Sequence, residues 1–189
     1  MVKSCCHAIM CMKPVFVLLA VSTIDGRIAK GSAHMTDWSS KEDKVFLHKK
    51  LDEGDAVVVG NNTYKTARGP LSRRNCIVFT RKVRGMKRES DYLVYLNPEK
   101  TSLEKFVSSM GYRKIVVLGG AKTYSYFLEN GLVDEIFLTI EPVVFGSGIS
   151  MFESGFKPRR FSLVSSRRLN RAGAVLLHYS SRKFSGALQ

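Results

Sequence analysis

The 189-residue chain contains no hydrophobic run long enough to cross a membrane, which takes about 18 residues or more. The apolar segment VFVLLAV, Val15–Val21, has seven residues, which is the length of a buried strand. The N-terminal stretch MVKSCCHAIMCMK lacks the order of a secretory signal, in which a charged start precedes an apolar core and a small-residue cleavage site. We therefore expect a cytoplasmic protein without a membrane partner.

Cysteine is scarce and unevenly placed. Three of the four cysteines, Cys5, Cys6 and Cys11, lie with His7 in the first eleven residues, and Cys76 lies far from them. This spacing lacks the two separated pairs of a typical zinc module, so we predict no metal site. We expect residues 1–13 to form a loose, reduced tail, residues 14–183 a single domain, and residues 184–189 a second tail.

Acidic residues are few: 16 Asp and Glu stand against 30 Lys and Arg, which gives a net charge of +14. Such a charge attracts anions, including nucleic acids and phosphorylated or carboxylated small molecules. No helix-turn-helix, zinc-finger or RNA-recognition pattern accompanies it, so we expect no specific nucleic-acid partner. G-x-S-x-G and P-loop motifs are also missing, which argues against a hydrolase or a kinase.

Apolar periodicity predicts strands that alternate with helices. The predicted strands are Val15–Val21, Ala56–Gly60, Asn75–Thr80, Tyr92–Tyr95, Lys114–Leu118, Glu135–Glu141, Phe161–Ser166 and Ala174–Ser180. The predicted helices begin at Ser39 or Ser40, at Asn61, at a capping box formed by Thr101 and Glu104, and at Lys122. This order indicates a mostly parallel α/β sheet with antiparallel strands at its C-terminal edge, and ligands of such sheets bind beyond the carboxyl ends of the strands.

Asp43 is the first candidate at such an end. It follows a strand and a long loop that holds the only tryptophan, Trp38, and it falls in the first turn of a predicted helix. An acid there interacts favourably with the helix dipole, and a partly buried acid can also bind the amidine-like edge of a heterocycle. Both interpretations stand on these residues alone.

Glycines follow two other predicted strands. Gly60 precedes Asn61–Thr63 at the start of a helix, and Gly119-Gly120 precedes Lys122–Tyr124. Each place is either an ordinary capped turn or a point where free amides face an anion such as a diphosphate. Thr139 alternates with apolar neighbours, so its hydroxyl either packs in the core or faces the same cleft.

Taken in order, these motifs resemble the dihydrofolate reductase superfamily over nearly the whole chain, from about Pro14 to Tyr179. The resemblance rests on AVS…DGRIA…W-x4-D, VGNNTY…GPLSRRN-x-IVFTR, IVVLGGAKTY…FL and VDEIFLT. It implies an α/β, three-layer fold with a central, mostly parallel sheet of about eight strands, an antiparallel C-terminal edge and helices on both faces. It also implies NADPH as the cofactor, and we expect a monomer or a homodimer.

Two branches of the superfamily compete. STIDGRIA and GLVDEIFLTIEPVVFGSG resemble the riboflavin-pathway pyrimidine reductase, whereas the Trp38-to-Asp43 spacing, GPLSRRN and FTR resemble dihydrofolate reductase. Because a pterin pairs bidentately with an acid and Asp43 matches that acid, we predict NADPH-dependent reduction of 7,8-dihydrofolate to tetrahydrofolate. The alternatives are a riboflavin-biosynthesis reductase acting on a 5-phosphoribosyl-aminopyrimidine and a basic nucleic-acid-binding protein on the same fold.

The resemblance also assigns roles to single residues. Hydride passes to pterin C6, Asp43 favours the protonated imine electrostatically rather than delivering the proton, and Thr139 hydrogen-bonds to Asp43. The implied substrate contacts are Ala20, Val21, Asp43, Phe46, Leu47, Leu71, Arg74 and Thr139. The implied cofactor contacts are Ala20, Ile28, Ala29, Gly60, Asn61, Asn62, Thr63, Thr80, Arg81, Leu118, Gly119, Gly120, Ala121, Lys122, Thr123 and Tyr124. A cis peptide between Gly119 and Gly120 is part of the same prediction.

Overall fold

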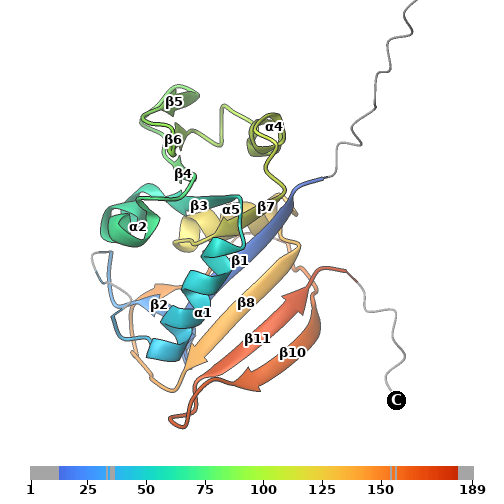
Figure 1. Cartoon of the computed structure of the whole chain (residues 1–189). Helices are drawn as coiled ribbons and strands as arrows, with labels where there is room; N and C mark the ends of the chain where they lie inside the picture. Colours follow the sequence, from blue (N-terminus) through green and yellow to red (C-terminus); the bar gives the residue numbers. More distant parts are fainter. Residues whose placement is uncertain (1–12, 33, 35–36, 154, 156, 183–189) are drawn as a thin grey trace, which may run out of the picture.

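The computed structural model describes residues 13–32, 34, 37–153, 155 and 157–182 (Figure 1). Apart from Lys13, the two predicted tails, 1–13 and 184–189, lie outside the described residues, and so do Cys5, Cys6 and Cys11. That residues 14–183 form a single domain stays a prediction.

A nine-stranded sheet runs through the molecule in the order β10-β11-β8-β1-β7-β3-β4-β6-β5, and β2 and β9 form a separate two-stranded sheet. Strands β8, β1, β7, β3, β4 and β6 run parallel to one another. At one edge β11 is antiparallel to both β8 and β10, and at the other edge β5 is antiparallel to β6. The strands are β1 Val15–Thr23, β2 Arg27–Ala29, β3 Ala56–Gly60, β4 Cys76–Phe79, β5 Met86–Arg88, β6 Leu93–Leu96, β7 Lys114–Val117, β8 Glu135–Glu141, β9 Ile149–Ser150, β10 Ser162–Arg168 and β11 Val175–Ser180.

This architecture confirms the predicted α/β fold, and the ends of each predicted strand agree with the structure to within two residues. Three strands, β2, β5 and β9, were not predicted. Each has only two or three residues, and none of their residues is buried, so no run of apolar residues marks them.

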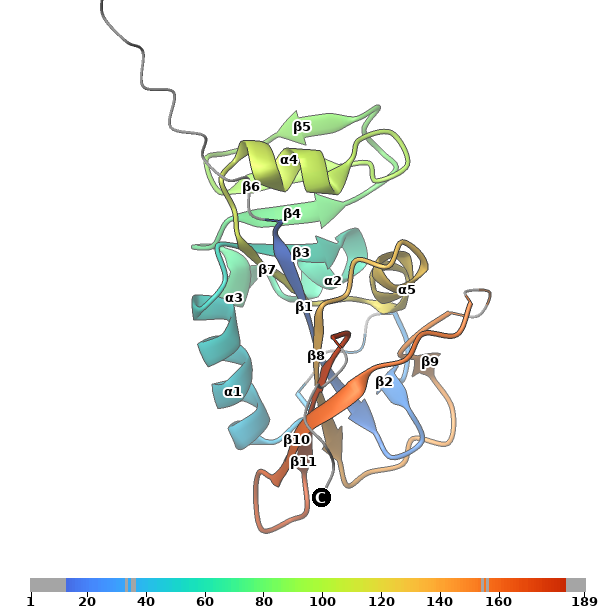
Figure 2. The same cartoon turned by 90° about the vertical axis from the view of Figure 1, so that its right-hand side faces the viewer.

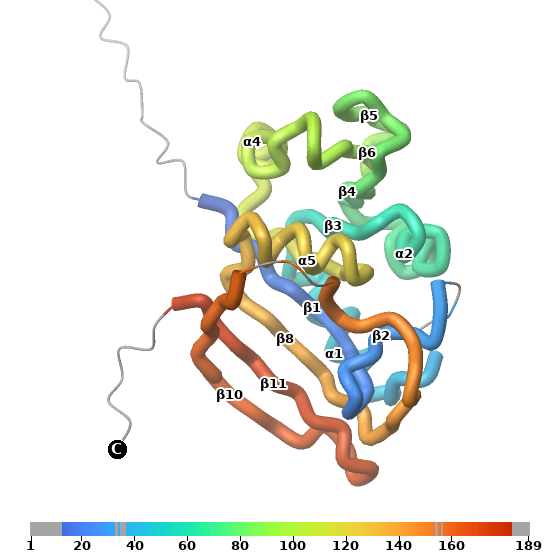
Figure 3. The backbone as a smooth tube through the Cα atoms, turned by 180° about the vertical axis from the view of Figure 1, so that it is seen from behind, coloured from blue at the N-terminus to red at the C-terminus, as the bar shows by residue number. Residues whose placement is uncertain are grey.

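Helices cover both faces of the sheet, as expected. They are α1 Lys41–Asp52, α2 Asn61–Thr66, α3 Arg68–Leu71, α4 Leu103–Ser109 and α5 Ala121–Glu129. Figure 2 shows α1 and α5 on opposite sides of β1, and Figure 3 shows from behind that α5 lies over β1 while β10 and β11 form the edge beyond β8.

Alternate residues of β1 supply the two cores, because successive side chains of a strand point to opposite faces. Phe16 and Leu18 pack with Phe127 of α5, whereas Val17 and Leu19 pack with Phe46 of α1. Both cores are apolar and fully covered, so the two helices are held in fixed positions against the strand that runs between them.

The helix starts refine the sequence prediction. Of the two candidate serines before α1, Ser40 is the N-cap, and its hydroxyl accepts a hydrogen bond from the Asp43 amide at 3.3 Å. The predicted capping box of Thr101 and Glu104 is wrong, because the side chain of Ser102 caps α4 by accepting from the Lys105 amide. Within the described ranges, no helix is both long and apolar enough to cross a membrane.

Candidate active site

The parallel strands bring their carboxyl ends to one edge of the sheet. Thr23, Gly60 and Glu141 end β1, β3 and β8 there, and Gly119 lies two residues beyond the end of β7. Most of the residues that the sequence singled out lie on this edge or on the helices that begin at it. The region beyond the carboxyl ends of β1, β3, β7 and β8 is therefore where a sheet of this type usually binds a ligand.

Asp43 is a buried acid, with 6% of its surface exposed. It lies in the first turn of α1, and the hydroxyls of Thr139 on β8 and Ser39 before α1 donate hydrogen bonds to its carboxyl group. Burial raises the pKa of Asp43 above its ordinary value, those two hydrogen bonds lower it, and the charge of Glu141 raises it further. The net direction is upward, which keeps this carboxyl protonated at a higher pH than an exposed aspartate.

Thr139 fulfils the expectation that it hydrogen-bonds to Asp43. It is 1% exposed, and its β8 position lies opposite Val21 on β1. Val21 and Thr139 thus stand side by side, with Ala20 buried on the other face of β1. Thr139 is therefore a core residue whose hydroxyl is bonded to the acid, and that it faces a bound ligand stays a prediction.

Tyr124 reaches the same region from the opposite side of β1. Its hydroxyl donates a hydrogen bond of 2.7 Å to the Leu19 carbonyl. Burial raises the pKa of Tyr124 strongly, and the nearby charge of Asp43 acts in the same direction. Tyr124 therefore stays a neutral donor, and the structure brings it near the acid.

A group of glycines forms the second half of the site. The Gly60 amide donates to the Gly119 carbonyl at 2.7 Å, and a Cβ at Gly60 would lie 2.9 Å from the Thr123 hydroxyl. A Cβ at Gly120 would lie 3.4 Å from the Thr63 hydroxyl. The Gly119–Gly120 peptide is cis, as predicted. The backbone of these glycines therefore lies close to the hydroxyls of Thr63 on α2 and Thr123 on α5. We call Gly60, Gly119, Gly120, Thr63 and Thr123 together the glycine cradle.

The start of the helix that follows these glycines has features suited to an anion. The nine-residue helix α5 begins at Ala121, and its N-cap Gly120 has no side chain to accept from the first amides of the helix, which suits such an N-terminus to an anion. Lys122 in the first turn of α5 and Arg81 beyond β4 are both exposed, and each carries a positive charge suited to phosphate. Thr80 and Arg81 follow Phe79, which lies opposite Gly60, so they are at the same edge of the sheet as the glycines. That Gly60–Thr63, Thr80-Arg81 and Gly119–Tyr124 contact the cofactor stays a prediction, and of these Thr123 and Tyr124 are buried.

Four of the expected substrate contacts lie away from these glycines. Leu71 is 1% exposed and Phe46 is buried against Phe137, so both are core residues, and Leu47 is half-buried beside them. Arg74 precedes β4 at the opposite edge of the sheet, where its guanidinium donates to the Asp52 carboxylate and the Pro70 carbonyl. With Asp52 it lines a surface hollow of about 240 Å³ that is separate from the glycine cradle.

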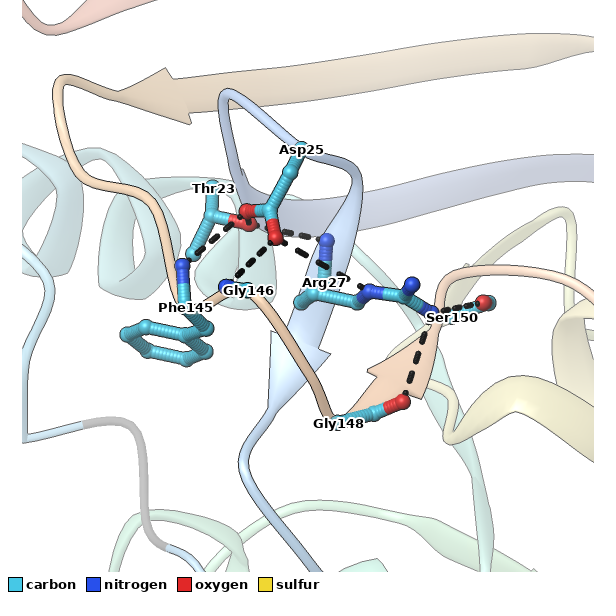
Figure 4. A network of polar contacts seen from close by, with 7 residues as sticks. All are labelled: Thr23, Asp25, Arg27, Phe145, Gly146, Gly148 and Ser150. Atoms are coloured by element: carbon cyan, nitrogen blue, oxygen red, sulfur yellow. Dashed lines mark hydrogen bonds and ion pairs between the residues drawn. The ribbon is translucent and has the colours of Figure 1, made fainter.

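The expected nicotinamide contacts Ile28 and Ala29 belong to β2, which pairs with β9. A polar network fixes this pair of strands (Figure 4). The Asp25 carboxylate accepts from the Thr23 hydroxyl and from the amides of Phe145 and Gly146, and Arg27 donates to Ser150 and to the Gly148 carbonyl. The sequence did not predict this network, because Asp25 and the amides that it accepts from lie 120 and 121 positions apart.

Glu141, 5% exposed at the end of β8, is the other residue that the sequence did not single out. The signal for it was an acid directly after the apolar strand and two positions beyond Thr139, on the same face. Within the described part of the chain, no three His, Cys, Asp or Glu side chains are placed to hold a metal ion together.

Comparison with known proteins gives the family. The model of the RibD C-terminal domain matches residues 70–174, more than half of the chain. An uncharacterized protein of Bacillus subtilis (strain 168), YwjB, is 27% identical over 170 residues, which cover 86% of this chain and 95% of that protein.

Two solved structures share the fold. A Thermotoga maritima diaminohydroxyphosphoribosylaminopyrimidine deaminase/5-amino-6-(5-phosphoribosylamino)uracil reductase has a TM-score of 0.68 at 21% identity, covering 89% of this chain and 56% of that one. Dihydrofolate reductase from Enterococcus faecalis, complexed with NADP(H), has a TM-score of 0.67 at 16% identity, covering 89% of this chain and 97% of that one.

These findings confirm the superfamily resemblance, with its riboflavin-pathway features, and NADPH as the cofactor. They overturn the predicted reduction of dihydrofolate, because the matching family model is that of the pyrimidine reductase branch. The chain is an NADP-dependent reductase. It belongs to the RibD C-terminal domain family.

Proposed function

We propose that the chain reduces a 5-phosphoribosyl-aminopyrimidine with NADPH. The observation that carries this proposal is the buried Asp43–Thr139 pair at the same sheet edge as the glycine cradle of Gly60 and Gly119. The proposal takes its substrate class from the Thermotoga maritima protein, whose name includes 5-amino-6-(5-phosphoribosylamino)uracil reductase. A cytoplasmic location and a monomeric or homodimeric state belong to the same proposal.

The chemistry of the substrate explains why a buried acid is useful. The reducible carbon of a ribosylamine is its anomeric carbon, which becomes an electrophilic C=N carbon when the sugar ring opens. Ring opening needs a proton on the ring oxygen, and reduction then needs a hydride at the anomeric carbon. Bound NADPH supplies that hydride.

The purely electrostatic role expected of Asp43 belonged to dihydrofolate, and for the sugar substrate we assign Asp43 the delivery of the proton as well. Its raised pKa favours the protonated carboxyl, which donates to the ring oxygen as the carbon–oxygen bond breaks. The resulting carboxylate then faces the positively charged C=N group and stabilises it until hydride arrives. Thr139 and Ser39 hold the carboxyl group through their hydroxyls, and one proton from solvent restores Asp43 after each turnover.

The charge of the protein suits both ligands. A net charge of +14 attracts phosphorylated substrate and cofactor alike. Lys122 and Arg81, exposed beside the cradle, are the cations that we assign to the cofactor phosphates.

The proposal is tested by Asp43→Asn, with Asp91→Asn on the exposed surface as the matched control. We expect Asp43→Asn to lower kcat about 100- to 10,000-fold, the usual contribution of a general acid. The affinity for NADPH, measured by fluorescence titration, should stay within about twofold, because Asp43 does not belong to the glycine cradle. Turnover of 5-amino-6-(5-phosphoribosylamino)uracil by Asp43→Asn at the normal rate would refute the role of Asp43.

The pH profile provides a second readout. Because the protonated form of Asp43 is the active one, kcat/KM should fall as the pH rises through the raised pKa of Asp43. In Asp43→Asn this descending limb should disappear, whereas it should persist in Asp91→Asn.

A further inference from the structure

We propose that Glu141 is a positioning residue that holds Asp43 in place through Ser40 and brings a second buried acid close to it. This inference rests on the proposed role of Asp43 as the acid. It concerns a residue that is not among the expected site residues, and its evidence is a continuous set of contacts between β8 and α1.

Glu141 is placed by the strand register. It is the last residue of β8 and lies opposite Thr23 on β1, on the same face of the sheet as Thr139. Its side chain is buried, with 5% of the residue exposed. A buried carboxylate is costly unless it is hydrogen-bonded, so its partners matter.

Ser40 supplies both partners. Glu141 Oε1 accepts from the Ser40 amide at 2.8 Å and from the Ser40 hydroxyl at 2.6 Å. Ser40 is the N-cap of α1, and its Oγ in turn accepts from the Asp43 amide at 3.3 Å.

The direction of these bonds is determined by the chemistry of a hydroxyl group. Ser40 has a single hydroxyl proton, and donating it to Glu141 leaves the oxygen lone pairs free for the Asp43 amide. Glu141 therefore orients the cap that orients Asp43. The two acids are 98 positions apart in sequence, but only one serine separates them in this chain of hydrogen bonds.

The second effect of Glu141 is electrostatic. Its negative charge raises the pKa of Asp43, in addition to the larger effect of burial, because a second nearby charge disfavours ionisation. The other charged or titratable groups that act on or near Asp43 are Lys44 on α1, which lowers the pKa, and Tyr124 on α5, which stays neutral. Glu141 is thus the one acid among these neighbours in the described chain.

Glu141→Gln separates charge from hydrogen bonding, because the amide oxygen of Gln still accepts from Ser40. The measurement is a carboxyl ¹³C NMR titration of the protein without ligands, in which the midpoint of Asp43 is read directly and assigned with Asp43→Asn. We expect this midpoint to move to lower pH in Glu141→Gln. In the matched control Glu135→Gln, at the other end of β8, it should stay where it is in the unchanged protein.

An unchanged Asp43 midpoint in Glu141→Gln would overturn the inference. A role confined to stability would lower the unfolding temperature without moving this titration. Because the titration needs no substrate, it still tests Glu141 if the proposed substrate is not turned over, so the two failures are distinguishable.

Ser40→Ala tests the positioning part on its own and serves if Glu141→Gln does not fold. It removes the hydroxyl that joins Glu141 to Asp43 but keeps the buried charge. We expect kcat to fall about three- to tenfold while the KM for NADPH stays unchanged, since only the acid is displaced. An unchanged kcat in Ser40→Ala would contradict the positioning role.

Discussion

Gly119 illustrates how the absence of one side chain shapes the candidate site. Its φ angle of +85° lies in the left-handed region, and a Cβ there would lie 2.5 Å from the ring of Tyr124. The ring cannot retreat freely, because the Tyr124 hydroxyl is bonded to the Leu19 carbonyl at 2.7 Å. Gly119 therefore permits both the close approach of Tyr124 and the open backbone of the cradle.

Gly119→Ala should accordingly destabilise the protein by about 2–4 kcal/mol, since the left-handed conformation and the overlap with Tyr124 both cost free energy. NADPH affinity should fall as well, because the displaced backbone belongs to the cradle. Chemical unfolding and fluorescence titration measure the two effects.

The matched control is Gly69→Ala in α3, where a Cβ meets nothing within 4 Å and φ is not positive. Its stability should lie within about 1 kcal/mol of the unchanged protein. Equal stability of the two variants would contradict our interpretation of Gly119.

Single residues of the site were predictable to different degrees. Asp43 and Thr139 were recognisable because each carries a local signal: a first-turn acid after a predicted strand, and a polar residue inside an apolar strand. Glu141 was not, because its role depends on a contact with Ser40 across 101 positions of sequence. Leu71 and Phe46 were expected to contact substrate, but both are buried in the core. The sequence cannot separate these cases, because an apolar residue has the same pattern in a core and in a pocket.

The loop that follows β8 contacts two other parts of the chain: the turn that precedes β2 and the segment that leads into α1. The Phe145 ring contacts the Trp38 ring, with centroids 5.0 Å apart, and the Phe145 amide donates to Asp25. Asp25 thus anchors a loop that packs against the segment leading to Asp43. The hydrogen bond from Thr23 is the main reason that the pKa of Asp25 is lowered.

Asp25→Asn should loosen this loop. An Asn side chain has one acceptor oxygen, so it cannot accept from the Thr23 hydroxyl and from the amides of Phe145 and Gly146 as a carboxylate does. We expect hydrogen exchange of these two amides to accelerate about tenfold or more at neutral pH. Asp91→Asn should leave both amides unchanged, and slow exchange in Asp25→Asn would show that the loop is held by other contacts.

The same anchor has a defined pH dependence. Because the pKa of Asp25 is lowered in the fold, its stabilising contribution is fully present above the ordinary value of 3.8 and is lost as the pH falls through the lowered pKa. Protection of the Phe145 and Gly146 amides in the unchanged protein should therefore decrease on acidification below that value.

Elements were predictable where burial imposes a pattern. The parallel strands β1, β3, β4, β7 and β8 consist largely of buried residues, and their sequences read as apolar runs. β2 and β9 depend instead on Asp25 and Arg27, which join segments more than 115 positions apart. Only tertiary contacts hold such short, polar strands together.

At the scale of the whole molecule, the sequence predicted the fold but not the reaction. The Trp38-to-Asp43 spacing and the GPLSRRN stretch that favoured dihydrofolate reductase also fit a sheet that hosts more than one reductase. The match to the RibD C-terminal domain decided the branch, because it runs without a break from α3 to the residue before β11, whereas the other signals are isolated motifs.

The central claim is hydride transfer to the anomeric carbon of a phosphoribosylaminopyrimidine. The most direct measurement uses NADPH carrying two deuterons at C4, 5-amino-6-(5-phosphoribosylamino)uracil as substrate, and mass spectrometry with NMR of the product. Our account predicts a ribitylamino product with one deuteron on the former anomeric carbon, formed about 100- to 10,000-fold more slowly by Asp43→Asn at the same protein concentration. Failure to reduce this compound, together with deuterium transfer to dihydrofolate in a parallel reaction, would contradict it.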